Sequence, residues 1–462
     1  MEHYIFYCKL SLLAVLSLIT ACCMLSRRWY VNLAAFLACL SGETFLAHLF
    51  FPGYMLCPAA ASFIILFLSR IWDLSRTPAK GNGADPIRLP VRSGIRESRL
   101  EFYYHYSNFL VYGGAGSGKT KSIGKWLLSE YMRLGFAGFI YDFKDTDYTR
   151  TAYNLIKRHR YPHKFYYVSF DRPERSYRFN PLKVVRDRTE LIQLMEDVLL
   201  ALLPKKEQQN EWVAGGLGIL RGVAFRFWDE FPEHCTLPHI LAFIMTASAR
   251  QLSLFLQQNL VSEMLAGAYL KAEGSEKTQA SYLSTLCNNL ATISQNEEIA
   301  YVLSGDDFDF NLIDPENPKL FAVSNNFSKN SVYAPVISML MTISARQFSM
   351  QNRVPFVYFL DEMTTVNIKN FETLPSVLRE YKAAFILLTQ SGAKLENLYG
   401  KLDRSSVEAN FGNMFLGRTK DVEALKYYPL FFGKEEKERR SRSSGKSCLL
   451  YTSPSPRDRS LS

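Results

Sequence analysis

One eight-residue segment constrains the fold more than any other feature of the chain. It reads Gly113-Gly114-Ala115-Gly116-Ser117-Gly118-Lys119-Thr120, which fits GxxxxGK[ST] with additional glycines. Residues 108–112 before it predict a short strand, and the spacing of Ile123, Trp126 and Tyr131 after it predicts a helix over 121–133. Glycine lets successive N–H groups turn inward around a phosphate, and a helix N-terminus attracts anions. We therefore expect an α/β fold that binds ATP, in which Lys119 reaches the β- and γ-phosphates and Thr120 holds Mg²⁺.

A second segment supplies the acidic residues that such a site needs. Residues 356–360 form a continuous apolar run, typical of a strand buried on both faces, and Asp361 and Glu362 follow directly. We expect Asp361 to bind the Mg²⁺ shell and Glu362 to orient and deprotonate the attacking water.

A third predicted strand, over 384–388, ends at Thr389-Gln390-Ser391. In RecA-like ATPases a polar residue at this place senses the γ-phosphate, and Gln390 is the candidate. The alternative is an amide that only caps the loop after the strand.

The spacing of these motifs divides the chain. Between Thr120 and Asp361 lie 240 residues, which exceeds what a RecA-like core needs. Residues 139–142, 164–169 and 320–324 read as core strands, whereas 184–305 has helical patterning throughout. The prediction is a RecA-like P-loop ATPase domain built from residues 76–183 and 306–433, with an all-α domain inserted at 184–305.

The first 75 residues predict a transmembrane anchor. Residues 10–25, 33–51 and 55–72 are apolar, and Arg27 and Arg28 close the first run as at a cytoplasmic interface. A bilayer core needs about 20 apolar residues per helix, which leaves two or three spans open because Glu43 interrupts the middle run. The rival interpretation is a lipoprotein cleavage box ending at Cys22, which would send the chain outside the cell, away from ATP. We expect a bacterial inner-membrane protein with a cytoplasmic ATPase domain.

Charge and cysteine content exclude little. The net charge of +10 fits a nucleic-acid partner, an anionic membrane surface, or basic loops beside a membrane. The eight cysteines include no CxxC pair and predict neither a metal site nor a disulfide framework. Residues 434–462 are predicted to be a disordered tail, and their end, from Cys448 to Arg459, is similar to a translated sequencing adapter and is interpreted as non-native.

Together these motifs resemble the type IV secretion coupling proteins, the conjugative ATPases of the TraG/TraD-like family. The order of anchor, P-loop, helical insertion and acidic strand is the family's order. Three short motifs also support the resemblance: Asp142-Phe143-Lys144, Asn180-Pro181-Leu182, and Arg379-Glu380-Tyr381 followed by Gln390-Ser391. Phe143 and Asp145 depart from the proline and glycine that the family usually has around the lysine, which puts a fixed role for Lys144 in doubt.

The resemblance implies a function and a set of partners. It implies an ATPase that recruits a DNA–relaxase or effector substrate and pumps it into a secretion channel, with DNA, relaxase, channel proteins and the inner membrane as partners. It further implies a homo-hexamer with ATP between neighbouring subunits. That arrangement needs an arginine supplied in trans, for which Arg379 is the first candidate and Arg418 the second.

Two rival functions remain open from the sequence. One is another FtsK/HerA-like translocase that moves double-stranded DNA or exports protein. The other is a non-catalytic membrane receptor with a degenerate nucleotide fold, against which the intact Lys119, Thr120, Asp361 and Glu362 argue.

Overall fold

The computed structural model describes residues 5–7, 9–15, 29–51, 60, 64, 85–93, 96–144, 146–203 and 207–432. The chain divides into two compact units, Met1–Pro86 and Ile87–Ser462. The predicted tail 434–462, most of the apolar run 10–25 and nearly all of the run 55–72 lie outside the described residues.

The described part of the first unit is helical. Residues 9–15 are helical, and the middle apolar run lies in α2 (Trp29–Phe50). Among the residues that the structure describes, no helix combines the length and the apolar character that crossing a membrane requires.

The second unit is built on a seven-stranded parallel sheet with the order β5-β6-β4-β7-β8-β3-β9. All its pairings are parallel, so the carboxyl ends of the strands share one edge. The strands are β3 (Phe109–Tyr112), β4 (Ala137–Asp142), β5 (Lys164–Ser169), β6 (Lys319–Ser324), β7 (Phe356–Asp361), β8 (Ala383–Thr389) and β9 (Asn413–Leu416). A separate antiparallel hairpin precedes them, formed by β1 (Ile87–Ser93) and β2 (Arg96–Phe102).

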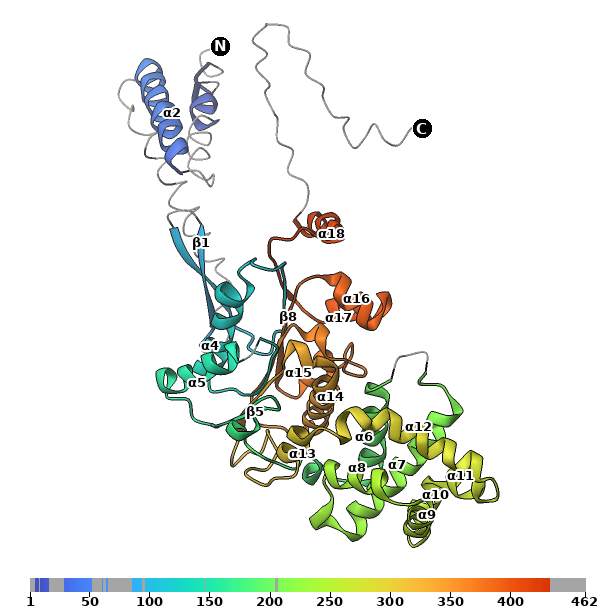
Figure 1. The fold of residues 1–462 in the computed structure, drawn as a ribbon. Coiled ribbons are helices and arrows are strands. Elements are labelled where there is room, and N and C mark those ends of the chain that lie inside the picture. The colour runs from blue at the N-terminus through green and yellow to red at the C-terminus, as the bar shows by residue number, and fades with distance from the viewer. Residues whose placement is uncertain are drawn as a thin grey trace, which may run out of the picture. The chain divides into compact units, whose positions relative to one another are not determined.

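Helices cover both faces of the sheet, which gives the three-layer architecture seen in Figure 1. Alternate side chains of β7 divide between two buried clusters, because successive strand residues point to opposite faces: Tyr358 enters one cluster and Phe359 the other. On the Phe359 side lie α4 (Lys125–Arg133) and α5 (Asp147–His159). The Tyr358 side is covered by four helices, α14 (Asn330–Arg346), α15 (Leu374–Glu380), α16 (Gly392–Tyr399) and α17 (Lys401–Ala409). The last described helix is α18 (Val422–Phe432).

A group of helices lies between β5 and β6 in the chain and stands beside the sheet in Figure 1. It comprises α6 (Arg188–Ala201), α7 (Glu211–Glu230), α8 (Leu237–Thr246), α9 (Ala249–Gln257), α10 (Leu260–Leu265), α11 (Gly267–Lys271), α12 (Glu276–Ser294) and α13 (Glu297–Leu303). The described residues between 184 and 305 contain no strand. The apolar residues of these helices belong to the same buried cluster as the sheet face that contains Tyr358, so the helices pack onto the sheet domain.

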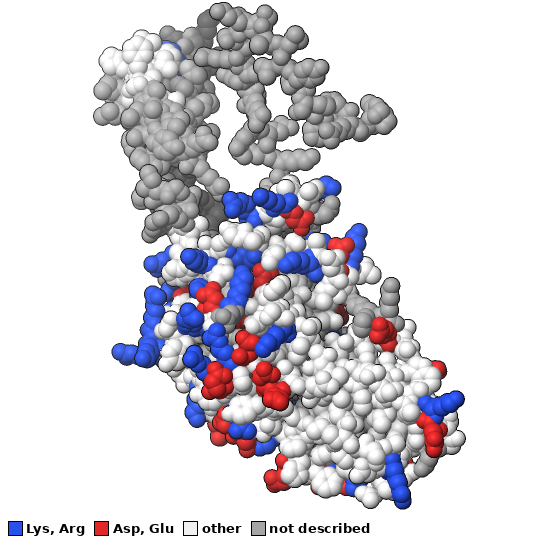
Figure 2. All heavy atoms as spheres, in the orientation of Figure 1, with Lys and Arg blue, Asp and Glu red and all other residues white. Residues whose placement is uncertain are grey.

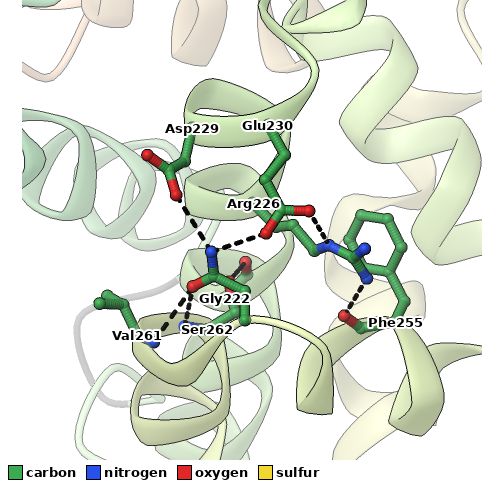
Figure 3. A network of polar contacts seen from close by, with 8 residues as sticks. Gly222, Arg226, Asp229, Glu230, Phe255, Val261 and Ser262 are labelled. Atoms are coloured by element: carbon green, nitrogen blue, oxygen red, sulfur yellow. Dashed lines mark hydrogen bonds and ion pairs between the residues drawn. The ribbon is translucent and has the colours of Figure 1, made fainter.

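A polar cluster fixes three helices of this group to one another (Figure 3). The Asn259 Oδ1 accepts the N–H groups of Val261 and Ser262 at 3.1 Å each, and its Nδ2 donates to Glu230 at 2.8 Å. Arg226 donates to Glu230 at 2.9 Å and lies 4.1 Å from the ring centroid of Phe255. Since these contacts satisfy the orphan amides at the start of α10 and a buried guanidinium, they stabilise the α7–α9–α10 corner.

Candidate active site

The glycine-rich loop leaves the buried strand β3 at the carboxyl edge of the sheet. Gly116 and Gly118 have φ values of +71° and +89°, which L side chains rarely adopt. Within the described residues, the Gly116 and Gly118 N–H groups have no hydrogen-bond acceptor. A one-turn π-helix (Lys119–Gly124) follows and runs into α4. The loop therefore presents free amides beside a helix start, as an anion site requires.

Lys119 is folded back over this loop. Its ammonium donates to the Gly113 carbonyl and lies 3.7 Å from the Glu362 Oε1. The side chain is 7% exposed, and burial lowers the pKa of Lys119, while the Glu362 carboxylate opposes that shift. The cation therefore sits at the loop where a phosphate would be held.

The two carboxylates stand at the end of β7, between the ends of β4 and β8. Asp361 is 1% exposed, and neither of its oxygens has a hydrogen-bond partner among the described residues. Burial, with a further contribution from Glu362, raises the pKa of Asp361 to about 7. An unsatisfied buried carboxylate is costly unless a cation or proton meets it, so the chemistry of this position fits a Mg²⁺ ligand.

The structure has no cluster of three or more histidine, cysteine or acidic residues able to hold a metal, as far as its described residues show. A magnesium site of the P-loop type needs no such cluster, because one hydroxyl, one carboxylate, water and phosphate oxygens share the ion. Thr120 and Asp361 would hold it here.

One hydrogen-bond donor and two ammonium groups lie around a single oxygen of Glu362. Gln390 Nε2 lies 3.3 Å and Lys144 Nζ 4.0 Å from its Oε1, in addition to Lys119. The other oxygen, Oε2, is buried without a described partner. Glu362 has φ of +46°, a strained conformation for a residue with a side chain. Strain and an unused oxygen at the same residue mark it as the candidate general base.

Gln390 lies where the sequence places it, because β8 runs between β7 and β3. Its amide meets Glu362 rather than only capping a loop. Lys144 also reaches the site, with its side chain about half exposed. Asp142 from the same motif has a structural role instead. Its carboxylate accepts hydrogen bonds from the Thr149 backbone N–H at 2.8 Å and from the Thr149 hydroxyl at 2.9 Å, in the first turn of α5.

The two arginine candidates occupy opposite edges of the sheet. Arg379 is exposed in the last turn of α15, just before β8 begins, so it lies at the amino edge and away from its own glycine-rich loop. Seven strand residues at about 3.3 Å each separate the two edges of β8. Arg418 lies at the carboxyl edge, where its carbonyl accepts the Gly114 N–H at 3.0 Å.

The strand that supports this loop was not predicted from the sequence. β9 pairs with β3, and the Gly417 N–H donates to the Tyr112 carbonyl at 2.7 Å. The available signal was an apolar segment, Met414-Phe415-Leu416, placed between Gly412 and Gly417. Because both glycines punctuate a short run, a strand was inferable there.

Comparison with known proteins identifies the family. The model of the type IV secretion-system coupling protein DNA-binding domain matches residues 100–448, well over half of the chain. The chain belongs to the type IV secretion-system coupling proteins. The predicted resemblance is thereby confirmed.

Solved structures of a coupling protein share the fold. TrwBdeltaN70, a bacterial conjugative coupling protein in complex with sulphate, is 16% identical with a TM-score of 0.55, over 75% of this chain and 76% of that one. TrwB with ADP and Mg²⁺ is 17% identical with a TM-score of 0.53, over 66% of this chain and 69% of that one. TrwB with the ATP analogue ADPNP gives 16% and 0.55, over 75% and 76%. No curated protein sequence matches the chain.

Proposed function

We propose that this coupling protein is a membrane-anchored ATP hydrolase that recruits a DNA–relaxase or effector substrate and pumps it into a type IV secretion channel. The observation that carries the proposal is the meeting of Lys119, Asp361, Glu362 and Gln390 at one edge of the sheet, in a chain that matches the coupling-protein family. The proposal assigns nucleotide binding to Lys119, the metal to Asp361 and the activation of water to Glu362.

The ligands are ATP and Mg²⁺. TrwB has been crystallised with ADP and Mg²⁺ and with ADPNP, and the corresponding fold here carries the residues to hold them. Residues 113–120 would surround the phosphates, with Thr120 and Asp361 on the metal. When bound, Mg²⁺ neutralises charge that develops on the phosphates.

The remaining steps belong to the protein's own side chains. Once Lys119 turns from Glu362 to the phosphates, the carboxylate loses its nearest cation and can accept a proton from water. Gln390 donates an amide hydrogen at 3.3 Å to the same Oε1 and so fixes the direction of the carboxylate. General-base catalysis of this kind contributes about 10²- to 10⁴-fold to a rate.

The assembly is proposed to be a homo-hexamer with ATP between subunits. Two features of Arg379 support this: it is exposed, and no side-chain partner is seen for it among the described residues. An arginine at the amino edge cannot serve its own phosphate site, so a role would require a neighbouring subunit. We place residues 1–75 in the bacterial inner membrane and the ATPase domain in the cytoplasm, from the apolar runs and their basic flanks.

Phosphate release by purified full-length protein tests the catalytic part of the proposal. Glu362→Gln should retain binding of a fluorescent ATP analogue but lower turnover by at least about 10²-fold, the usual scale for loss of a general base. Lys119→Ala is the matched variant, because it should weaken nucleotide binding itself. Normal turnover in Glu362→Gln would show that another residue activates water. No phosphate release from the wild type would favour a non-catalytic receptor.

A further inference from the structure

A loop beside the candidate active site carries an exposed aromatic ring. β4 and β6 are paired and end together at Asp142 and Ser324, so the segments that come after them emerge side by side at the carboxyl edge. The loop after β6 is residues 325–329. Phe327 in this loop is 82% exposed, and its ring lies edge-on to Phe143, with centroids 6.5 Å apart.

The surroundings of Phe327 are polar and basic rather than apolar. Asn326 and Ser328 flank it, and Lys329 follows. The side chain of Lys144, next to Phe143, is about half exposed, and its ammonium lies 4.0 Å from the Glu362 Oε1. Lys329 is 44% exposed and lies 2.9 Å from Asp171. A subunit interface buries contiguous apolar area, which an isolated ring does not provide. An exposed aromatic ring, with Lys329 on its own loop and Lys144 on the neighbouring loop, instead matches single-stranded nucleic acid, whose bases stack and whose phosphates attract cations.

The same loop is joined to Glu362 by a chain of hydrogen bonds. Asn325 Nδ2 donates to the Tyr141 hydroxyl at 2.8 Å, and that hydroxyl lies 2.6 Å from the Thr365 Oγ1. The Thr365 hydroxyl in turn donates to the Glu362 carbonyl at 2.7 Å. Each hydroxyl donates onward, so one consistent direction runs from Asn325 to Glu362.

The end of this chain is the strained residue. Glu362 holds φ at +46°, and Asn325 and Tyr141 are nearly inaccessible to solvent. Because these linked groups are buried and hydrogen-bonded in series, a movement of the loop should shift the Glu362 backbone and with it the position of the Glu362 carboxylate.

We propose that residues 325–329 are a nucleic-acid contact in which Phe327 stacks on a base, and that Asn325, Tyr141 and Thr365 transmit this contact to Glu362. The inference rests on the proposed function, since it names where the DNA substrate touches the motor. It makes Phe327 a binding residue and Tyr141 a positioning residue.

The test uses full-length protein in detergent and a fluorescein-labelled single strand of thymidine. Phe327→Ala should weaken binding at least about fivefold and lose DNA-stimulated ATP turnover, because one stacking contact is removed. Its turnover without DNA should equal that of the wild type. Phe327→Trp should restore both properties. Met350→Ala is the control: Met350 is 81% exposed, but it precedes β7 and so lies toward the opposite edge.

A second variant separates contact from transmission. Tyr141→Phe removes only the hydroxyl that joins Asn325 to Thr365, so it should keep DNA affinity and lose stimulation. Full stimulation in Tyr141→Phe would overturn the transmission path. DNA affinity in Phe327→Ala equal to that in Met350→Ala would overturn the contact, and loss of subunit assembly in Phe327→Ala would assign the ring to a neighbouring copy instead. A wild type that neither binds nor responds to DNA would overturn the proposed function and this inference together.

Discussion

At the scale of single residues, Asp361 and Glu362 at the end of β7 differ in their polar partners. Glu362 has three polar partners on one oxygen, whereas Asp361 has none among the described residues. The two residues are adjacent in the chain and almost fully buried. Lys119 and Lys144 act on both carboxylates, but only Glu362 has these lysines within 4.0 Å and an amide donor, Gln390.

The raised pKa of Asp361 predicts a pH-dependent stability. Its folded-state pKa of about 7 exceeds the unfolded value of about 3.9, so the folded state binds more protons between these values. The contribution of Asp361 to the free energy of unfolding should therefore fall as pH rises from about 4 to 7 and then level off. In nucleotide-free, Mg²⁺-free buffer, Asp361→Asn should be more stable than the wild type, by a margin that grows from pH 5 to pH 8. Thermal unfolding measures this margin, and a constant margin would contradict a buried, uncompensated carboxylate.

The sequence predicted residues that the structure brings together at the carboxyl edge of the sheet, but it did not predict the contacts between them. A phosphate loop, an acidic pair and a strand-end amide each leave a local pattern, so Lys119, Asp361, Glu362 and Gln390 could be named. Arg418 was predicted only as a possible trans-acting arginine. The hydrogen bond from the Gly114 N–H to its carbonyl could not be predicted, because a backbone contact does not depend on the side chain. The Asn325–Tyr141–Thr365 chain joins three distant segments, and no periodicity reports such a contact.

At the scale of elements, one helix shows where periodicity misleads. The predicted face of residues 121–133 included Trp126, but Trp126 is 43% exposed. Leu128 and Met132 are buried instead. Trp126 and Tyr131 are five residues apart in the regular helix α4, which places them about 140° apart around its axis, so one narrow face does not bury both. Likewise, residues 277–303 lack a helix breaker, yet the chain ends α12 at Ser294 and starts α13 with Asn296 as its cap.

The inserted helices offer a test of local stability. Asn259→Ala removes the cap of α10 and the bonds to Asp229 and Glu230, and it should lower stability by about 1–2 kcal/mol, the usual cost of losing such a cap. Asn288→Ala, at an exposed position of α12, should change stability by no more than about 0.5 kcal/mol. Chemical denaturation of the two variants compares them. Equal losses would show that the network in Figure 3 contributes nothing specific.

At the scale of the whole molecule, charge is unevenly distributed. On the face shown in Figure 2, lysine and arginine gather over the sheet-bearing part, and the helical part carries few charges. Between Cys235 and Asn296 the charged residues are Arg250, Glu263, Lys271, Glu273, Glu276 and Lys277, three of each sign. Phosphate attraction should therefore come mainly from the sheet domain, where the loop 325–329 also lies.

Mixed rings test the subunit arrangement. Arg379→Ala should lack the trans-acting cation and Glu362→Gln the general base, so each alone should be nearly inactive. In a mixed ring, an intact Arg379 can face an intact Glu362, and part of the ATP turnover should return. Turnover is measured on mixtures whose co-assembly is verified by cross-linking. If co-assembled rings stay inactive, Arg379 is not the residue that acts between subunits.

An ATPase motor that DNA stimulates can be tested by one measurement. It is the ATP turnover of the oligomeric wild type, with and without added DNA, across a series of salt concentrations. Binding to phosphates releases counterions, so affinity falls steeply with salt, and a backbone grip has little sequence preference. DNA of unrelated sequences is expected to raise ATP turnover at low salt to similar extents, and the increase is expected to disappear at high salt. Turnover that DNA never changes, in a preparation that is oligomeric and hydrolyses ATP, would contradict the account and favour export of protein without DNA.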